Sequence, residues 1–334
     1  MRRVLIPSAG GYEKLQLVDA PDPTPGQDEE LVRVEAIGVN YADCIVRMGL
    51  YASAKEYVGW PITPGFEIAG TTREGTRVVA LTRFGGYATH VVVPKRQVFP
   101  LPKGFSMAEG AAFPAVSLTA YYALFELCRL RPEMSLLVHS AAGGVGSVLV
   151  TLGKIAGCRV VGVVGSTSKV EYVRALGADH VIDKSSEDLW RQAERHSPRG
   201  YDVVLDANGV ETLGGSFRHL APTGRLVVYG FATMMSRGKD RPSWPKLAVD
   251  WLRTPRFDPL TMTNENKSVM AFNLSYLFDR PDILAESMAA LSSWIEQGKL
   301  TAPRVQTFPM DRVADAHRAL ESGKTVGKLV LEPR

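Results

Sequence analysis

The sequence predicts an α/β protein in which a parallel, doubly wound sheet follows a region of mostly antiparallel β-structure. Three observations support this prediction. Short β-rich runs separated by many turn residues fill the N-terminal part of the chain. Strands and helices alternate from Pro114 onward, as in sheets covered by helices on both faces. A cluster of glycines lies between an apolar strand and a helix, where such sheets bind ligands.

Length and composition narrow the class of protein. The chain has 334 residues, of which 45% are hydrophobic and 22% are charged. One hydrophobic core rarely supports a chain of this length, so two domains are expected. The net charge of +4 includes no long run of like charges, so we expect no nucleic-acid partner.

Cysteine usage and hydropathy indicate the compartment. The three cysteines, Cys44, Cys128 and Cys158, match no disulfide or metal-binding spacing, which favours a reducing environment. No signal-peptide core precedes the strand-like residues 3–6, and no apolar stretch approaches the ~20 residues that span a bilayer. We therefore expect a cytoplasmic protein without a transmembrane segment.

Residues 1–117 form the first predicted region. Turn residues, including the run PDPTPG at 21–26, separate short β-rich segments. The predicted strands are 31–39, 77–81 and 88–93. This pattern is typical of mostly antiparallel, barrel-like β-structure.

The next region predicts the parallel sheet. A helix-like segment runs from Pro114 to Leu127, and strands and helices then alternate. The predicted strands are 136–139, 159–164, 180–182, 203–206, 225–229 and, after an irregular stretch, 269–274. The predicted helices are 144–156, 169–176, 187–196 and 212–220.

The C-terminal segment is expected to return to the first domain. Its predicted elements are a helix at 283–297, a β-like run at 305–308, a helix at 313–322 and a strand at 328–331. The sequence therefore predicts a discontinuous domain over residues 1–117 and 276–334, and a continuous domain over residues 118–275.

The glycine cluster is the most informative motif. The sequence AAGGVG at 141–146 directly follows the apolar strand and opens the next helix. Gly143 and Gly144 remove side chains where a backbone must approach a pyrophosphate, and Gly146 allows helix and strand to pack closely. The helix N-terminus adds unpaired N–H groups and a partial positive charge. These features predict a dinucleotide site, although the first glycine of the usual fingerprint is Ala141.

The end of the second strand predicts which dinucleotide binds. NAD enzymes usually place an acid there to hold the ribose 2′-hydroxyl. Here the loop GSTSK at 165–169 contains no acid, and Ser166 and Lys169 offer donors and positive charge to a 2′-phosphate. We therefore expect NADPH, with a solvated surface lysine as the alternative role of Lys169.

Further motifs extend over the full chain. They are GVNYAD at 38–43 with Arg47, GLY at 49–51, PGFE at 64–67, GYA at 86–88, and AAFP at 111–114 leading to LTAY at 118–121. Together with AAGGVG and GSTSK, they resemble the medium-chain dehydrogenase/reductase superfamily and, within it, the quinone oxidoreductase group. The segments TRFGGYA at 82–88, NKS at 266–268 and FNL at 272–274 are similar to the vesicle amine transport protein branch.

This resemblance implies a GroES-like catalytic domain built from both chain ends and a Rossmann domain between them. It also implies that the nicotinamide end of NADPH contacts Asn40, Tyr51 and Thr119. The remaining cofactor contacts implied by the resemblance are Ala142, Gly143, Gly144, Val145 and Gly146 at the pyrophosphate, Ser166 and Lys169 at the 2′-phosphate, and Asn208, Tyr229, Phe231, Phe272 and Lys324.

Three positions depart from patterns found in parts of the superfamily. Some members place a tyrosine at the position of Asp183, beside the adenosine phosphate, and an acid there opposes part of the 2′-phosphate site. Zinc alcohol dehydrogenases carry a cysteine and a histidine where this chain has Asn40 and Phe66. Other candidate ligands, Cys44, Glu67 and His90, show no ligand spacing, so we expect no metal.

Without a metal, the protein would hold the nicotinamide against an electrophile and guide a proton to the developing oxyanion. The predicted catalytic residues are Asn40, Tyr51 and Tyr41, with water as a further proton source. Packing is the alternative role for both tyrosines. Asp43 is expected to make hydrogen bonds in a turn rather than act as an acid.

Residues 233–267 are the least patterned stretch and are expected to determine the substrate. Trp244, Leu247, Ala248 and Trp251 recur at helical spacing. Three interpretations remain open: a helix covering the sheet, a bulky apolar substrate wall, and a basic helix on a membrane surface.

Three functions fit these observations. The first is an NADPH:quinone reductase, and the second reduces α,β-unsaturated ketones, aldehydes or acyl thioesters. Either enzyme would take an apolar or aromatic small-molecule electrophile. The third is an NADPH-binding sensor or interaction protein with little turnover. A homodimer is also expected from the resemblance, through the sheet edge near residues 269–274.

Overall fold

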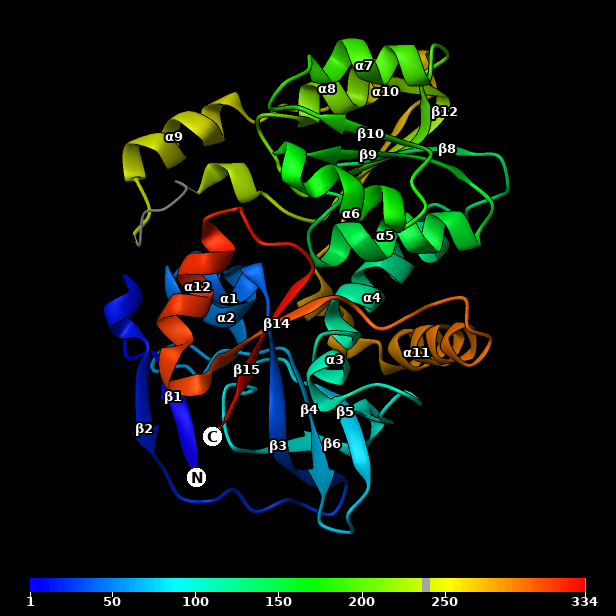
Figure 1. The fold of residues 1–334 in the computed structure, drawn as a ribbon. Helices are drawn as coiled ribbons and strands as arrows, with labels where there is room; N and C mark the ends of the chain where they lie inside the picture. Colours follow the sequence, from blue (N-terminus) through cyan, green and yellow to red (C-terminus); the bar gives the residue numbers. More distant parts are fainter. Residues whose placement is uncertain (236–240, 334) are drawn as a thin grey trace. The chain divides into compact units, whose positions relative to one another are not determined.

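The computed structural model describes residues 1–235 and 241–333. Its contacts divide the chain into two compact units, which Figure 1 shows coloured along the sequence. Of the described residues, unit 1 contains Met1–Leu118, Arg241, Pro242 and 274–333. Of the described residues, unit 2 contains 119–235 and Ser243–Asn273. The helix α4 (Pro114–Tyr121) carries the chain from the first unit into the second.

Unit 1 is built on a sheet with strand order β14-β15-β3-β4-β5-β7, in which β6 also pairs with β3. All pairs are antiparallel except β14 with β15. The C-terminal strand β15 completes the sheet by pairing with β3, and Val39 lies opposite Leu329. The strands of this sheet are β3 (Glu29–Val39), β4 (Glu67–Thr72), β5 (Arg77–Leu81), β6 (His90–Pro94), β7 (Val98–Pro100), β14 (Val305–Pro309) and β15 (Lys328–Glu332). Strands β1 (Arg2–Leu5) and β2 (Gln16–Asp19) form a separate two-stranded antiparallel sheet.

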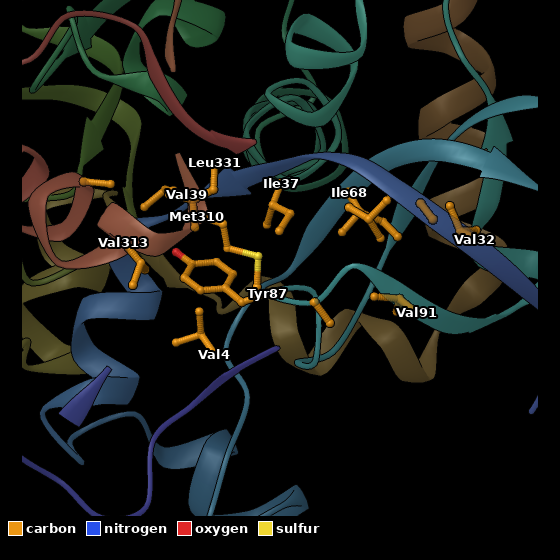
Figure 2. Packing of buried hydrophobic residues seen from close by; sticks show 14 of the residues in the cluster. Val4, Val32, Ile37, Val39, Ile68, Tyr87, Val91, Met310, Val313 and Leu331 are labelled. Atoms are coloured by element: carbon orange, nitrogen blue, oxygen red, sulfur yellow. The ribbon is translucent and has the colours of Figure 1, made fainter. Parts of the chain in front are cut away.

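The helices of unit 1 are short except for one. They are α1 (Tyr41–Arg47), α2 (Ala52–Tyr57), α3 (Met107–Ala111), α11 (Pro281–Glu296) and α12 (Val313–Glu321). Figure 2 shows the core between α12 and the sheet, where Val4, Ile37, Tyr87 and Leu331 are fully buried. Residues from both chain ends therefore share one hydrophobic core.

Unit 2 is a six-stranded parallel sheet of order β10-β9-β8-β11-β12-β13. Numbered along the unit, this order is 3-2-1-4-5-6, which is the order of the doubly wound Rossmann fold. Figure 1 shows α5 and α6 on one face of the sheet and α7 and α8 on the other. The strands are β8 (Ser135–Val138), β9 (Arg159–Val164), β10 (His180–Asp183), β11 (Tyr201–Asp206), β12 (Leu220–Val228) and β13 (Ser268–Ala271).

The α-helices of unit 2 follow its strands singly after β8 to β11 and as a pair after β12. They are α5 (Gly144–Ile155), α6 (Val170–Ala175), α7 (Leu189–His196), α8 (Leu213–Arg218), α9 (Trp244–Arg253) and α10 (Pro259–Glu265). The fold class predicted from the sequence is confirmed by the two sheets, one mostly antiparallel in unit 1 and one parallel and doubly wound in unit 2.

Several predicted elements differ from the structure. The helix expected over 114–127 changes at Tyr121 into a π-helical segment, Tyr122–Leu127. The strand expected over 269–274 ends at Ala271, and Leu274–Asp279 is a 3-10 helix. β4 was not predicted because Gly70 lowers the strand signal, and that glycine is required: a Cβ there would lie 2.1 Å from the Arg33 carbonyl oxygen on β3.

Candidate functional site

The cofactor residues predicted in unit 2 follow the carboxyl ends of its parallel strands. Because these ends lie along one edge of the sheet, residues far apart in sequence are brought to the same edge. The residues placed there are Ala142, Gly143, Gly144, Val145 and Gly146 after β8, Ser166 and Lys169 after β9, Asn208 after β11, Tyr229 and Phe231 after β12, and Phe272 after β13.

The glycine turn after β8 has the form that an anion site requires. Ser140 has φ +53°, and Gly143 caps α5 with no side-chain hydrogen bond to the first-turn N–H groups. A Cβ on Gly146 would lie 2.2 Å from the Ser140 carbonyl oxygen. The turn therefore holds the helix N-terminus close to the strand and leaves its N–H groups to a ligand, so these residues fit a pyrophosphate.

The loop after β9 lies beside the next strand of the sheet. Ser166 Oγ and Ser168 Oγ are 3.1 Å apart, and Lys169 follows on a short 3-10 turn. None of residues 165–169 is acidic, so nothing in this loop repels a phosphate on the ribose 2′-oxygen.

The carboxylate of Asp183, which was expected to disfavour a 2′-phosphate nearby, makes hydrogen bonds within the protein. It accepts from Ser185 Oγ at 2.6 Å, from the Ser185 N–H at 3.0 Å and from Thr167 Oγ1 at 2.6 Å. These bonds, led by that from Ser185, hold the pKa of Asp183 below its usual range. The acid therefore ties the loop after β9 to the end of β10.

Lys184 is a cation at this edge that the sequence reasoning missed. Its N–H donates to the Val164 carbonyl oxygen at 3.1 Å, which places it next to the end of β9. Its Cε lies 3.9 Å from where a Cβ on Gly165 would be. Lys184 directly follows Asp183, the position expected beside the adenosine phosphate, and this adjacency could have predicted a cation there.

The remaining predicted residues of this edge pack around the strand ends. Asn208 Oδ1 accepts from Ser140 Oγ at 2.9 Å. The Phe272 ring lies 4.9 Å from the Tyr122 ring. The Tyr229 hydroxyl is buried and has no hydrogen-bond partner among the described residues. A buried hydroxyl of this kind is a group that a bound ligand can satisfy.

The catalytic candidates Asn40, Tyr41 and Tyr51 belong to unit 1, as does the predicted cofactor residue Lys324, whereas Thr119 is the first residue of unit 2. Tyr51 caps α2 and packs edge-on against Phe66, with ring centroids 5.7 Å apart. Tyr41 is the first residue of α1, and Lys324 is exposed on the turn before β15.

Asn40 sits in a dense polar network at the end of β3. Its side-chain Nδ2 donates to Glu67 Oε1 at 2.9 Å, and Lys328 Nζ donates to its Oδ1. Lys328 and Glu67 are themselves an ion pair at 2.6 Å. Asn40 is only partly buried, whereas both partners are buried.

Asp43 makes the hydrogen bonds expected of it and is fully buried. Its carboxylate accepts from the backbone N–H groups of Asn40 and Gly65, both at 2.8 Å, and from the Tyr87 hydroxyl at 3.1 Å. Burial raises the pKa of Asp43 to about 7. The Tyr87 hydroxyl also lies 3.3 Å from His317 Nε2, and burial lowers the pKa of His317 to about 3.

The stretch expected to determine the substrate contains α9, while its residues 236–240 lie outside the described residues. The interpretation of α9 as a helix whose tryptophan face covers the sheet is wrong, because Trp244 and Trp251 are 67% and 63% exposed. A cavity of about 420 Å³ beside α9 is lined by Val210, Glu211, Pro245, Lys246, Val249, Asp250 and Arg253. Because four of these seven residues are charged, the cavity differs from the bulky apolar substrate wall that the sequence left as one interpretation.

Over residues 1–235 and 241–333, no helix has the length and apolar character needed to cross a membrane. Within the same described ranges, no group of three or more His, Cys, Asp or Glu side chains could hold a metal ion.

The sheet order and the glycine turn define unit 2 as a dinucleotide-binding Rossmann unit. Comparison with known proteins agrees. The family model described as alcohol dehydrogenase GroES-like domain matches residues 26–103, and the model described as zinc-binding dehydrogenase matches residues 176–331.

Individual relatives are similar over the full chain. The synaptic vesicle membrane protein VAT-1 homolog of Danio rerio is 34% identical over 342 residues, covering 99% of this chain and 69% of that protein. The quinone oxidoreductase of Thermus thermophilus, solved alone and with NADPH, is 31% identical with a TM-score of 0.83 and full coverage of both chains. CurK enoyl reductase is 25% identical with a TM-score of 0.85, covering 99% of this chain and 98% of that one. The chain therefore belongs to the medium-chain dehydrogenase/reductase superfamily, in its quinone oxidoreductase group.

The matched family description names zinc, and the residues present do not fit that ion. Asn40 stands where zinc members of the superfamily have a cysteine, and its carbonyl oxygen already accepts from the Lys328 ammonium. The same ammonium contacts Glu67. A cation at this position would face a resident positive charge and would lack the sulfur and nitrogen ligands that zinc prefers.

Proposed function

We propose that the chain is a zinc-independent, NADPH-dependent oxidoreductase that transfers a hydride to a quinone. The observation that carries the proposal is the glycine turn after β8, where Gly146 allows the N-terminus of α5, which has no side-chain cap, to approach the strand closely. The acid-free loop at 165–169 and the cations Lys169 and Lys184 favour NADPH over NADH. The quinone assignment is supported by the Thermus thermophilus relative.

When bound, NADPH supplies a hydride, and a proton from water or a side chain completes the reduction of the quinone to a hydroquinone, leaving NADP⁺. The residues of this chain would bind NADPH, orient the quinone against it and supply a proton. Asn40 offers a fixed amide N–H, and Tyr51 offers a hydroxyl on a ring that Phe66 and Phe84 pack against. Tyr41 is a further candidate proton donor at the start of α1.

Two other functions remain candidates. The similarity to CurK enoyl reductase favours reduction of an α,β-unsaturated ketone, aldehyde or acyl thioester, which needs the same cofactor but a different electrophile. The similarity to a VAT-1 homolog favours an NADPH-binding sensor or interaction protein with little turnover. The charged cavity beside α9 would then bind a partner group rather than a planar apolar substrate.

One experiment separates these functions. NADPH and NADH are titrated in parallel while tryptophan fluorescence is recorded, and NADPH oxidation is then followed with quinones and with enones. NADPH-selective binding with quinone turnover supports the proposal, and turnover with enones alone supports the second function. Binding without turnover supports a sensor, and no binding refutes the dinucleotide site. Activity that survives a metal chelator supports zinc independence.

The homodimer and the cytoplasmic location stay predictions. The edge position of β13 in the sheet agrees with a dimer formed there, because an exposed edge strand otherwise invites aggregation. Sedimentation over a range of concentrations tests the dimer, and a monomer at every concentration would contradict it. Cell fractionation tests the location.

A further inference from the structure

The carboxamide of Asn40 has its two polar atoms fixed by groups of opposite charge. Nδ2 donates to the Glu67 carboxylate at 2.9 Å, and Oδ1 accepts from the Lys328 ammonium. Turning the amide over would place N–H groups against the ammonium and the carbonyl oxygen against the carboxylate. Both contacts would then be repulsive, so the amide has one stable orientation.

The backbone of Asn40 is fixed as well. Its N–H donates to Asp43 Oδ2 at 2.8 Å, and the Asp43 N–H donates to the Asn40 main-chain carbonyl oxygen at 3.0 Å. Hydrogen bonds therefore hold both the backbone conformation and the side-chain orientation of Asn40.

Three neighbouring strands bring the network together. Glu67 begins β4, Asn40 directly follows β3 and Lys328 begins β15, and β3 lies between the other two strands in the sheet. Gly38 makes this possible, because a Cβ there would lie 2.5 Å from Glu67 Cγ. Glu67 Oε2 also accepts from the Ala115 N–H at 2.7 Å, which fixes the other side of the carboxylate.

Stability alone does not explain this arrangement. The Lys328 and Glu67 side chains are 4% and 0% exposed, so both charges are removed from water. Replacing such a pair with apolar groups of similar size is often neutral or stabilising. A buried ion pair whose two members both contact one partly exposed amide is explained better by the orientation that it imposes on that amide.

We infer that the buried pair Glu67–Lys328 positions the Asn40 amide as a hydrogen-bond donor toward a carbonyl oxygen of the bound electrophile or nicotinamide. With one N–H given to Glu67, the second N–H on Nδ2 is the one left for a ligand. This inference rests on the proposed function, which places Asn40 at the reacting groups. Glu67 and Lys328 act through Asn40 and are positioning residues.

The test is a mutant cycle. Asn40→Ala removes the amide, and the double variant Glu67→Gln with Lys328→Met removes both charges together and avoids leaving one of them unpaired. Each should lower kcat by about 10-fold to 100-fold, because misplacing one oriented group has effects of this size. The triple variant should lose no more than Asn40→Ala alone, since the pair acts only through the amide. The same cycle on the NADPH dissociation constant tests the inference even if turnover is absent.

Two further variants separate orientation from folding. Lys328→Arg keeps a charged donor and should retain more activity than Lys328→Met. The matched control replaces the buried pair Arg47–Glu321, whose side chains are 2.7 Å apart, by Met and Gln; Arg47 lies at the opposite end of α1 from Asn40. The folded control should keep kcat within about twofold of the unchanged protein.

The outcomes distinguish a failure of the proposed site from a failure of this inference alone. If Asn40→Ala leaves turnover and NADPH binding unchanged, Asn40 is not at the reacting groups, and both the proposed site and this inference are overturned. If Asn40→Ala is impaired but the folded double variant is not, or if the triple variant loses the sum of both effects, only the inference is overturned.

Discussion

Replacing Gly146 with alanine adds one methyl group at the centre of the proposed pyrophosphate site. The new Cβ would lie 2.2 Å from the Ser140 carbonyl oxygen and 2.8 Å from Ala141 Cα. Both are backbone atoms, so no side-chain rotation relieves the contact. Reaching 3.0 Å, below which real Cβ atoms are essentially never found, requires the helix or the turn to move by about 0.8 Å.

The size of the effect follows from this displacement. Overpacking of a rigid site costs about 1–3 kcal/mol, and the higher helix propensity of alanine offsets up to ~1 kcal/mol. A net loss of about 1–2 kcal/mol corresponds to a fall in Tm of roughly 2–8 °C for a unit of this size. NADPH binding should weaken by about tenfold or more, because each lost 1.4 kcal/mol of contact with the phosphates is worth a factor of about ten.

Gly153→Ala on the same helix is the matched control. Its Cβ would meet Leu136 Cδ2 and Val160 Cγ2, each at 3.0 Å, and these are the ends of side chains that can shift. We expect NADPH affinity within about twofold of the unchanged protein. Tryptophan-fluorescence titration and thermal unfolding measure both variants. A folded Gly146→Ala variant that binds NADPH as tightly as the unchanged protein, or an equal loss of affinity in Gly153→Ala, would refute a pyrophosphate site at this turn.

Further predictions concern charge. Lys169→Ala should weaken NADPH about tenfold or more while leaving NADH nearly unchanged, and equal losses would contradict a 2′-phosphate role. Lys184→Ala should show the same selectivity if its ammonium reaches that phosphate, whereas equal losses would place it at the pyrophosphate. His317, with its pKa lowered to about 3, reduces stability as pH falls below 6.5, whereas Asp43, with its pKa raised to about 7, increases stability as pH falls from about 7 toward 3.8. His317→Gln removes the histidine contribution, so the unfolding free energy should fall less steeply, by about 1.4 kcal/mol per pH unit, as the pH decreases from 6.5 to about 3. An unchanged slope would contradict the burial of a neutral His317.

Local patterns predicted the parallel sheet well. The strand Arg159–Val164 has the bounds expected from its sequence, because it is almost wholly apolar and buried, as central parallel strands are. The last strand was predicted too long, because Phe272 and Leu274 are apolar for a different reason: the Phe272 ring packs on Tyr122, and Leu274 begins a 3-10 helix.

The parts of the candidate site that local patterns missed depend on long-range pairing. The glycine turn and the loop at 165–169 could be predicted because each is a contiguous motif. Glu67 and Lys328 could not be paired from sequence, because they meet only when β4 and β15 line up on either side of β3. Before folding, Lys328 is indistinguishable from a surface lysine at the start of a strand.

A Ser–His–Asp constellation in unit 2 could suggest a hydrolase, and its geometry argues against that function. His139 Nε2 lies 3.0 Å from Ser216 Oγ, but this hydroxyl donates directly to Asp206 at 2.8 Å. In a catalytic triad the histidine lies between the acid and the serine. All three side chains are fully buried, so no substrate reaches the hydroxyl. Asp206 instead accepts from the backbone N–H of Asn208 at 2.8 Å, so the network fixes the turn that holds Asn208 at the edge where the cofactor is proposed to bind.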